Sequence, residues 1–175
     1  MKKTNWHVIT GAPCSGKTAV IRELERRGYA VVHEVARAYI DAQISKGRDL
    51  RQIKADLPAF EGHILKTKAR IEAGLDPDTI VFLDRAVPDS IAYFQLAGLD
   101  PAEPFKNSSV FRYRQIFLFE RIRFQTDAVR SEDDRIAADL DRLLEAAYRE
   151  LGYRPVRVPL LPVEERTQFV LKYLE

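Results

Sequence analysis

The sequence predicts an α/β fold with one parallel sheet of five strands and helices on both faces of that sheet. Short apolar runs alternate with longer stretches of helical spacing along the chain, which is the pattern of repeated strand–helix units. Glycine and proline stand between many of these runs, where turns are expected. The chain has 175 residues, 46% of them hydrophobic, and this length fits one domain, residues 1–175, with a substantial core.

Each element has its own signal in the sequence. The expected strands cover residues 6–10, 29–33, 79–83, 115–119 and 155–158. The expected helices cover about 17–27, 35–44, 50–64, 87–97, 131–151 and 163–174. All five strands are short and rich in apolar or β-branched residues, which is typical of buried parallel strands.

The helices of the first half follow from apolar spacing and from turn residues. An apolar face from Val20 to Leu24 marks the first helix, and Gly28 is a natural stop after it. The helix at 35–44 has similar spacing. In the next helix the apolar residues step by three and four: Leu50, Ile53, Leu57, Phe60 and Ile64. Pro58 interrupts that helix, so a kink or two short helices are expected.

The second half is divided by proline, glycine and capping signals. Pro88 lies near the first turn of the helix at 87–97, and Gly98 follows its end. Residues 101–109 are expected to form a loop or a short turn of helix, and 120–130 a polar surface segment. Residues 131–134, Ser-Glu-Asp-Asp, fit a capping box that opens the long helix. Pro159 and Pro162 bracket a tight loop before the last helix.

Composition excludes several classes of protein. The single cysteine, Cys14, allows no internal disulfide and indicates a reducing compartment. No apolar run approaches the roughly twenty residues of a spanning helix, and the first residues do not resemble a signal peptide. We therefore expect a cytoplasmic protein without a membrane span. The net charge of +2 does not favour general nucleic-acid binding.

A phosphate-binding motif follows the first strand. Residues 11–18, Gly-Ala-Pro-Cys-Ser-Gly-Lys-Thr, match the Walker A pattern G-x-x-x-x-G-K-[ST] between a strand and a helix. Glycines let the backbone curl so that its N–H groups face phosphate oxygens, and the helix dipole adds positive potential. Lys17 would reach the β- and γ-phosphates, and the Thr18 hydroxyl would bind Mg²⁺. The residues expected to bind nucleotide here are Gly11, Ala12, Pro13, Cys14, Ser15, Gly16, Lys17 and Thr18.

The thiol of Cys14 allows two interpretations. It is either a small residue that fits the loop or a thiol acidified by the helix end and open to oxidation.

The third expected strand ends in Asp84-Arg85, which resembles a Walker B strand. Ligands of such sheets collect at the carboxyl ends of the strands. Asp84 would hold Mg²⁺, directly or through water, or would take the proton from an attacking hydroxyl. Arg85 would hold a phosphate or orient the acceptor. The alternative is a helix-capping aspartate followed by a solvent-facing arginine.

The second expected strand ends in His33-Glu34, and Glu34 is a second candidate for the general base. The alternative is an ordinary surface ion pair between Glu34 and Arg37, one turn along a helix. His7, His33 and His63 show no metal-ligand spacing and are interpreted as structural or exposed.

Arginines crowd the chain around the fourth strand. They are Arg112, Arg114, Arg121, Arg123, Arg130 and Arg135. Acidic residues lie among them, so a solvated charged face is one interpretation. The phosphate loop favours another, a lid at about 120–131 that closes over the γ-phosphate. In this lid Arg121 would contact the nucleotide, Arg123 and Arg130 would act in catalysis, and Asp127 would brace the segment or touch the acceptor.

Several of these motifs occur together in one order. They are the loop 11–18, residues 34–37 (Glu-Val-Ala-Arg), residues 83–85 with Pro88-Asp89, Asp127 with residues 130–133, and Val158-Pro159 with residues 164–166. The combination resembles the family of small P-loop AAA-type ATPase and kinase domains that is similar to the nicotinamide riboside kinase domain of NadR. The resemblance covers nearly the whole chain.

This resemblance implies a three-layer P-loop NTPase fold of the nucleoside- and nucleotide-kinase type, with sheet order 2-3-1-4-5. It also implies ATP or GTP with Mg²⁺, and roles toward the acceptor and metal for Glu34 and for the Asp84-Arg85 pair. The chain shows no arginine-finger or motor signature of larger AAA machines.

Two classes of function follow. The first is a kinase that transfers a phosphoryl group from ATP to a nucleoside-like or other small metabolite. The second is a nucleotide-binding regulatory ATPase or GTPase without such an acceptor. A nucleic-acid end kinase is a weaker third interpretation. The absence of an N-K-x-D motif favours ATP over GTP, and the base is expected near residues 159–162. The sequence indicates neither the identity of the acceptor nor an oligomeric state.

Overall fold

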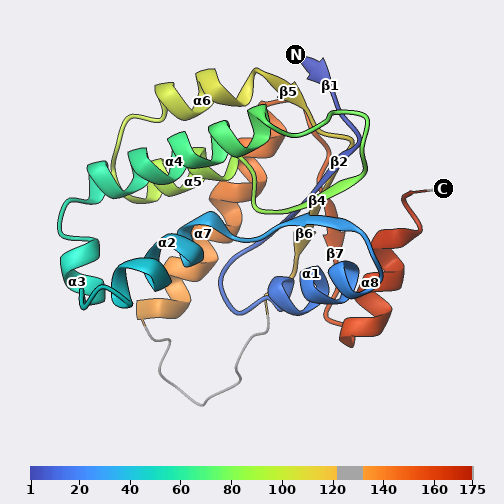
Figure 1. Ribbon diagram of the computed structural model, residues 1–175, viewed down its shortest axis with the longest axis horizontal. Helices are drawn as coiled ribbons and strands as arrows, with labels where there is room; N and C mark the ends of the chain where they lie inside the picture. Colours follow the sequence, from blue (N-terminus) through green and yellow to red (C-terminus); the bar gives the residue numbers. More distant parts are fainter. Residues whose placement is uncertain (122–131, 175) are drawn as a thin grey trace.

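A computed structural model describes residues 1–121 and 132–174 (Figure 1). Its main sheet has five strands, all parallel, in the order β3-β4-β2-β6-β7. The strands are β2 (Trp6–Thr10), β3 (Ala30–Val32), β4 (Val81–Asp84), β6 (Gln115–Phe119) and β7 (Val156–Val158). Numbered in chain order within this sheet, the strands run 2-3-1-4-5, which is the order that the family resemblance implied.

The central strand β2 is buried at all five positions. In register, Ile9 lies beside Asp84 of β4 and beside Phe117 of β6. This pairing brings the carboxyl end of β4 next to the residues that leave β2 for the phosphate loop. The registers therefore place the two strongest motifs of the sequence at one edge of the sheet.

Helices cover both faces of the sheet (Figure 1). They are α1 (Lys17–Arg26), α2 (Val35–Ile44), α3 (Leu50–Ile53), α4 (Leu57–Ala73), α5 (Asp89–Leu96), α6 (Ala102–Ser108), α7 (Glu132–Glu150) and α8 (Val163–Leu171). One face of the sheet packs against α1 and α8, and the other against α5 and α7. Helix α4 packs on α5, α2 packs on α4, and α3 packs on α2.

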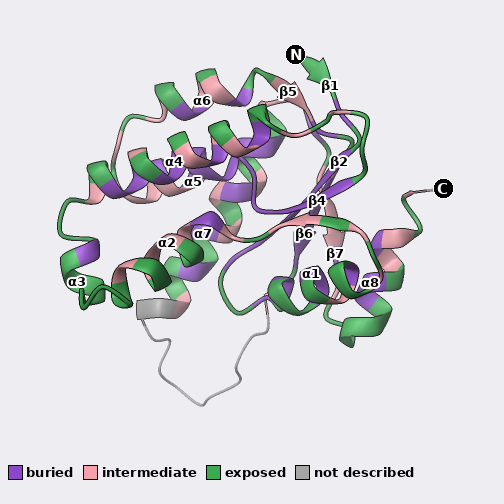
Figure 2. Cartoon of the chain, in the orientation of Figure 1, coloured by how far each residue is buried: buried purple, intermediate pink, exposed green. Residues whose placement is uncertain are grey.

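Alternation along the strands explains the two cores. Ile9 and Phe117 face α1 and α8, whereas Trp6 and Val8 face the opposite side near Tyr148 of α7. Figure 2 shows the buried residues concentrated on the sheet and on the inward faces of the helices. A sheet buried on both faces needs strands that are apolar at every position, and β2, β4 and β6 meet that need almost throughout.

Three features differ from the expectation or refine it. A second, two-stranded parallel sheet pairs β1 (Lys2–Lys3) with β5 (Phe111–Arg112), and no pattern in the sequence predicted it. Residues 102–108 form a helix, the more ordered of the two expectations for that segment. Pro58 lies in the first turn of α4, which Asp56 caps and which continues to Ala73. No described helix is both long and apolar enough to cross a membrane.

Candidate active site

The phosphate loop joins β2 to α1 through a strongly curved backbone. Gly11 has a φ of 139°, Cys14 of 58° and Gly16 of 80°, so three residues of the loop have positive φ values. A Cβ atom on Gly11 would lie 2.6 Å from the carbonyl oxygen of Phe119, which only glycine avoids. Within the described part of the chain, no side chain caps the N-terminus of α1. The backbone N–H groups there suit an anionic ligand.

Lys17 lies inside the curve of the loop. Its ammonium group donates to the carbonyl oxygens of Gly11 and Ala12, both at 2.9 Å, and to the Ser15 hydroxyl at 3.0 Å. The side chain is buried, and burial together with the nearby Arg85 lowers the Lys17 pKa below its ordinary value. An anion in the loop would offset that cost, because it would restore a favourable field around the ammonium group.

Asp84 ends β4 and is almost fully buried. Its Oδ1 atom has no hydrogen-bond partner among the residues that the structure describes. Burial and the neighbouring Glu34 raise the Asp84 pKa, while Lys17 opposes that rise. The capping alternative for Asp84 is wrong, because Pro88 holds the N-cap position of α5. An unpartnered buried carboxylate oxygen suits a metal ion or a hydroxyl donor.

Arg85 is a buried residue, and the solvent-facing alternative is wrong. Its guanidinium group donates to Glu34 Oε1 at 3.1 Å and to Asp89 Oδ1 at 3.3 Å. It also lies 5.3 Å from the centre of the Tyr93 ring. The residue has a φ of 67°, in the left-handed region, and its N–H donates to the Ile9 carbonyl oxygen. Such a backbone is strained for a residue with a Cβ, so several contacts must hold Arg85 in place.

Glu34 occupies the N-cap position of α2, and its side chain is 27% exposed. It pairs with Arg85 across the site. The alternative pair with Arg37 is wrong, because Arg37 contacts Asp41 instead. Glu34 is thus the carboxylate of the site that solvent reaches most readily.

Asp89 is a site residue for which the sequence analysis assigned no role. Its carboxylate accepts hydrogen bonds from the Thr10 hydroxyl (2.5 Å), the Ala86 N–H (2.9 Å), the Tyr148 hydroxyl (2.6 Å) and Arg85. Asp89 therefore ties the end of β2, the first turn of α5 and helix α7 to Arg85. Its place four residues after Arg85 was visible in the sequence, but its partner Tyr148 lies far away in the chain.

Lys68 of α4 is a second residue that the sequence analysis did not identify. It is buried, and its ammonium group donates to the Ser90 hydroxyl at 3.4 Å. Burial lowers the Lys68 pKa, and the nearby Asp89 opposes that change. The positive charge of Lys68 acts in turn on Asp89. Burial alone would raise the Asp89 pKa, but Lys68 and Arg85 lower that pKa below its ordinary value.

The crowded arginines separate into two groups in space. Arg112 and Arg114 precede β6 and lie at the amino edge of the sheet, away from the phosphate loop. Arg112 donates to the carbonyl oxygens of Leu151 and Gly152. Arg121 follows β6 and pairs with Asp134 at 2.8 Å. The other expected lid residues, Arg123, Asp127 and Arg130, lie outside the described residues.

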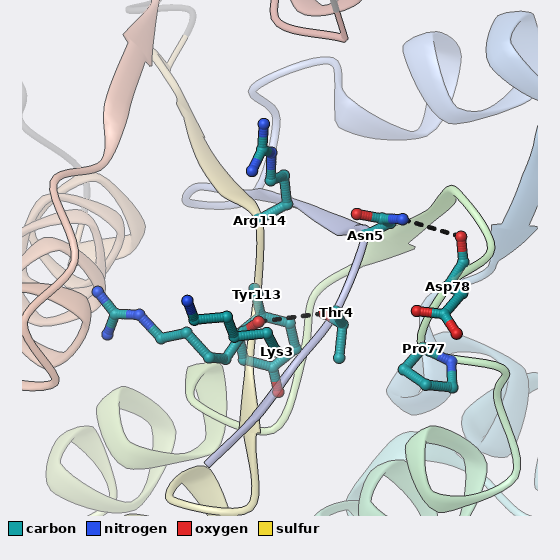
Figure 3. Close-up of a pocket in the computed structure, with 8 residues that line it drawn as sticks. Lys3, Thr4, Asn5, Pro77, Asp78, Tyr113 and Arg114 are labelled. Atoms are coloured by element: carbon teal, nitrogen blue, oxygen red, sulfur yellow. Dashed lines mark hydrogen bonds between the residues drawn. The ribbon is translucent and has the colours of Figure 1, made fainter.

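A cavity of about 320 Å³ also lies at the amino edge (Figure 3). Its lining residues lie in β1 and β5 and in the segments that precede β2, β4 and β6. Thr4 donates to the carbonyl oxygen of Arg112, and Asn5 donates to that of Asp78. Because these polar groups are paired within the protein and lie at the opposite edge from Lys17 and Asp84, we do not include the cavity in the candidate active site.

A family model described as an AAA domain matches residues 6–166. No curated protein matches the sequence. Among solved structures, NadR in complex with NR has a TM-score of 0.72 and 20% identity, covering 97% of this chain and 51% of that chain. The chain thus spans about half the length of that NadR chain. NadR in complex with NAD and AMP-PNP has a TM-score of 0.72 and 19% identity, covering 97% of this chain and 49% of that chain.

Two kinases are similar over nearly their full length. Thymidylate kinase from Ehrlichia chaffeensis has a TM-score of 0.68 and 14% identity, with 97% of each chain covered. Deoxyadenosine kinase from M. mycoides, with dCMP and dCDP, has a TM-score of 0.64 and 13% identity, again with 97% of each chain covered. At these identities the likeness shows the fold, an α/β domain with a parallel sheet, which agrees with the parallel sheet described above.

Proposed function

The chain belongs to the AAA-domain family, and from this premise and the geometry of the site we propose that it is a kinase. It would transfer the γ-phosphoryl group of ATP to a hydroxyl group of a nucleoside-like metabolite. The known kinases among the structural neighbours support this choice at the level of the reaction class. ATP is preferred to GTP because the chain has no N-K-x-D motif.

One observation carries the proposal: the ion pair between the buried Arg85 and the partly exposed Glu34 beside the phosphate loop. A nucleotide-dependent switch needs phosphate contacts and a metal ligand, which the loop and Asp84 would supply. The Arg85–Glu34 pair adds a donor and an acceptor beyond those needs. Such a pair can hold the hydroxyl groups of a second substrate, and Asp89 fixes its arginine.

Nucleotide binding is assigned to the phosphate loop. The N–H groups of the loop and of the first turn of α1 would surround the phosphates, and Lys17 would turn its ammonium group from the loop carbonyls to the β- and γ-phosphates. Lys17 would then stabilise the charge that grows on the leaving oxygen of ADP.

The residues present fit Mg²⁺. Asp84 offers a buried carboxylate oxygen without a partner in the described chain, and Thr18 offers an exposed hydroxyl in the first turn of α1. These two oxygen ligands are of the kind that Mg²⁺ takes. The ion, when bound with the nucleotide, neutralises charge on the β- and γ-phosphates.

Proton transfer is assigned to Glu34, because Glu34 is more exposed than Asp84 and an acceptor could therefore reach it more readily. The acceptor hydroxyl gives its proton to the Glu34 carboxylate, and its oxygen forms a bond to the γ-phosphorus. The bond between that phosphorus and the bridging oxygen breaks, and ADP leaves with the electron pair. Arg85 positions Glu34 throughout.

The test is to incubate the protein with Mg·ATP and a panel of ribonucleosides and deoxyribonucleosides that includes nicotinamide riboside. Mass spectrometry would follow the phosphorylated product, and a coupled assay would follow ADP. We expect at least one acceptor to gain a phosphoryl group at the same rate as ADP appears. ATP binding without any phosphorylated acceptor would contradict the kinase and favour the regulatory nucleotide-binding protein.

A further inference from the structure

Arg166 of α8 packs against the phosphate loop from outside. Its Nη1 atom donates to the carbonyl oxygen of Ser15 at 2.5 Å, and its guanidinium carbon lies 5.5 Å from the centre of the Phe119 ring. A Cβ atom on Gly16 would lie only 3.0 Å from Nη1, so the guanidinium group rests against the Gly16 backbone. Only 4% of the residue is exposed.

The charge of Arg166 has no carboxylate partner within ion-pair distance in the part of the chain that the structure describes. Its Nε atom is buried, and it too lacks a hydrogen-bond partner there. Burial lowers the Arg166 pKa, and the field of Glu120 opposes that change only in part. A guanidinium group stays charged in proteins, so a buried positive charge lies behind the phosphate loop. An anion on the other side of the loop would stabilise it.

The hydrogen bond also fixes a direction. In a trans peptide the C=O and the following N–H point in opposite directions within one rigid plane. Arg166 holds the carbonyl of Ser15 toward α8, so the N–H of Gly16 points away from α8. Gly16 is the N-cap residue of α1 and begins the row of N–H groups that would meet a phosphate.

We propose that Arg166 is a positioning residue for nucleotide binding, which orients the Ser15–Gly16 peptide of the phosphate loop and adds positive potential behind it. The proposal rests on the proposed function, since it requires the loop to bind a nucleoside triphosphate. According to this proposal, Arg166 contributes to the affinity for the nucleotide phosphates. It has no role in binding the acceptor or in proton transfer.

The test compares Arg166→Met, Arg166→Gln and Arg166→Lys with the wild type in the full chain. Calorimetry would give the Kd of Mg·ATP, and steady-state assays would give KM for ATP and for the acceptor. For the Met and Gln variants we expect the Kd and KM for ATP to rise by about tenfold to a hundredfold, with KM for the acceptor unchanged. Lysine keeps the charge and one donor, so it should restore a large part of the affinity. If the Met variant does not fold, the Gln variant provides the comparison with the wild type.

Arg27→Met is the matched control. Arg27 also links α1 to α8, through Glu164, but it does not contact the loop. We expect this variant to melt at a lower temperature and to bind Mg·ATP like the wild type. If Arg166→Gln binds Mg·ATP as tightly as the wild type, or if Arg27→Met weakens binding equally, the role of Arg166 is overturned while the proposed function stands. If the wild type itself binds no Mg·ATP, the proposed function fails, and the role of Arg166 fails with it.

Discussion

At the scale of single residues, the site is a set of buried charges that partly compensate one another. Lys17 and Arg85 are buried cations, and Asp84 and Asp89 are buried anions. Such groups are costly to bury alone, and each needs a partner of opposite charge or several hydrogen bonds. Asp89 has its donors within the protein, whereas Asp84 Oδ1 has none in the described chain. Asp89 is therefore the carboxylate that stabilises the fold, and Asp84 is the carboxylate that is available to a ligand.

The first prediction separates the roles of the two candidate carboxylates. For Glu34→Gln we expect kcat to fall by about a hundredfold to ten-thousandfold, because the proposed base is lost, while the Kd of Mg·ATP stays within about twofold. The glutamine oxygen can still accept from Arg85, so Arg85 stays in place. For Asp84→Asn we expect Mg²⁺ to lose most of its effect on ATP affinity. Stopped-flow kinetics and calorimetry would measure both.

Glu25→Gln is the control for this comparison, because Glu25 is exposed and contacts His33 away from the site. Wild-type turnover in Glu34→Gln would remove Glu34 as the base and return that role to Asp84.

The sequence identified Lys17, Asp84, Arg85 and Glu34 because each stands at a fixed place after a strand or within a motif. It did not identify Arg166 as a loop contact, because Arg166 is 151 positions from Ser15 and an arginine in a helix is ordinary. Local spacing suggested Arg37 as the partner of Glu34, but the partner is the buried guanidinium group of Arg85, which follows β4. Local spacing predicts neighbours on one helix and gives no information about contacts between elements.

At the scale of elements, β2 places an ionisable side chain between aromatic rings. His7 lies between Phe82 of β4 and Phe117 of β6, with ring centres 5.3 and 6.2 Å away. Its Nδ1 atom is buried and has no partner in the described residues. Burial, with a smaller contribution from Arg114, lowers the His7 pKa from 6.5 to about 4. The sequence left His7 as structural or exposed, and the structure shows that it is structural.

The second prediction follows from this shift. The unfolded chain binds a proton at His7 below about pH 6.5, but the folded chain does so only below about pH 4. The contribution of neutral His7 to stability is therefore present above pH 6.5 and is lost as the pH falls to 4. For His7→Leu we expect the loss of unfolding free energy between pH 7 and 4 to be smaller than in the wild type by about 3 kcal/mol.

Urea denaturation at several pH values would measure the unfolding free energy of the wild type and of His7→Leu. Both proteins contain the same carboxylates, so the effect of the carboxylates cancels when the two are compared. His33→Leu, at an exposed histidine, is the control and should keep the wild-type dependence. Equal pH slopes for wild type and His7→Leu would contradict the burial argument.

The third prediction concerns the contact between the phosphate loop and β6. In Gly11→Ala the new Cβ would lie 2.6 Å from the Phe119 carbonyl oxygen, at a φ of 139° that alanine avoids. We expect a loss of stability of about 2–4 kcal/mol and a loss of Mg·ATP binding. Gly47→Ala is the control, since its φ of 84° is also positive but no atom lies within 4 Å of the new Cβ. For Gly47→Ala we expect a loss of stability of about 1 kcal/mol. Equal melting temperatures for the two variants would contradict the close approach.

Elements with strong periodicity were predicted well: the bounds of β2, α2 and β6 are those expected from the sequence. The pair β1–β5 was missed because two-residue strands carry no periodicity, and its stability comes from contacts distant in the chain. The expected break at Pro58 occurs earlier, because Asp56 caps α4 and proline is favourable in a first helical turn.

At the scale of the whole molecule, the parallel sheet brings the site together. Every strand of the main sheet runs in one direction, so the phosphate loop after β2, Glu34 after β3 and Asp84 in β4 lie at one edge. The cavity of Figure 3 lies at the other edge. The fold class and the edge of the site could be predicted from the sequence. The Asp89 hydrogen bonds and the Arg166 contact could not, because they depend on how α5, α7 and α8 pack.

Calorimetric titration of the wild-type chain with ATP, in Mg²⁺ and in EDTA, tests the central claim most directly. We expect one ATP bound per chain in Mg²⁺, with a Kd in the range of about 1 µM to 1 mM, and weaker binding in EDTA. Lys17→Met should lose this binding, because it removes the buried ammonium group that would contact the phosphates. Arg22→Met, at an exposed cation of the same helix, should keep it. Mg²⁺-dependent binding by the wild type and Arg22→Met, but not by Lys17→Met, is the predicted result. No Mg²⁺-dependent binding of ATP or GTP to the wild type would contradict the account.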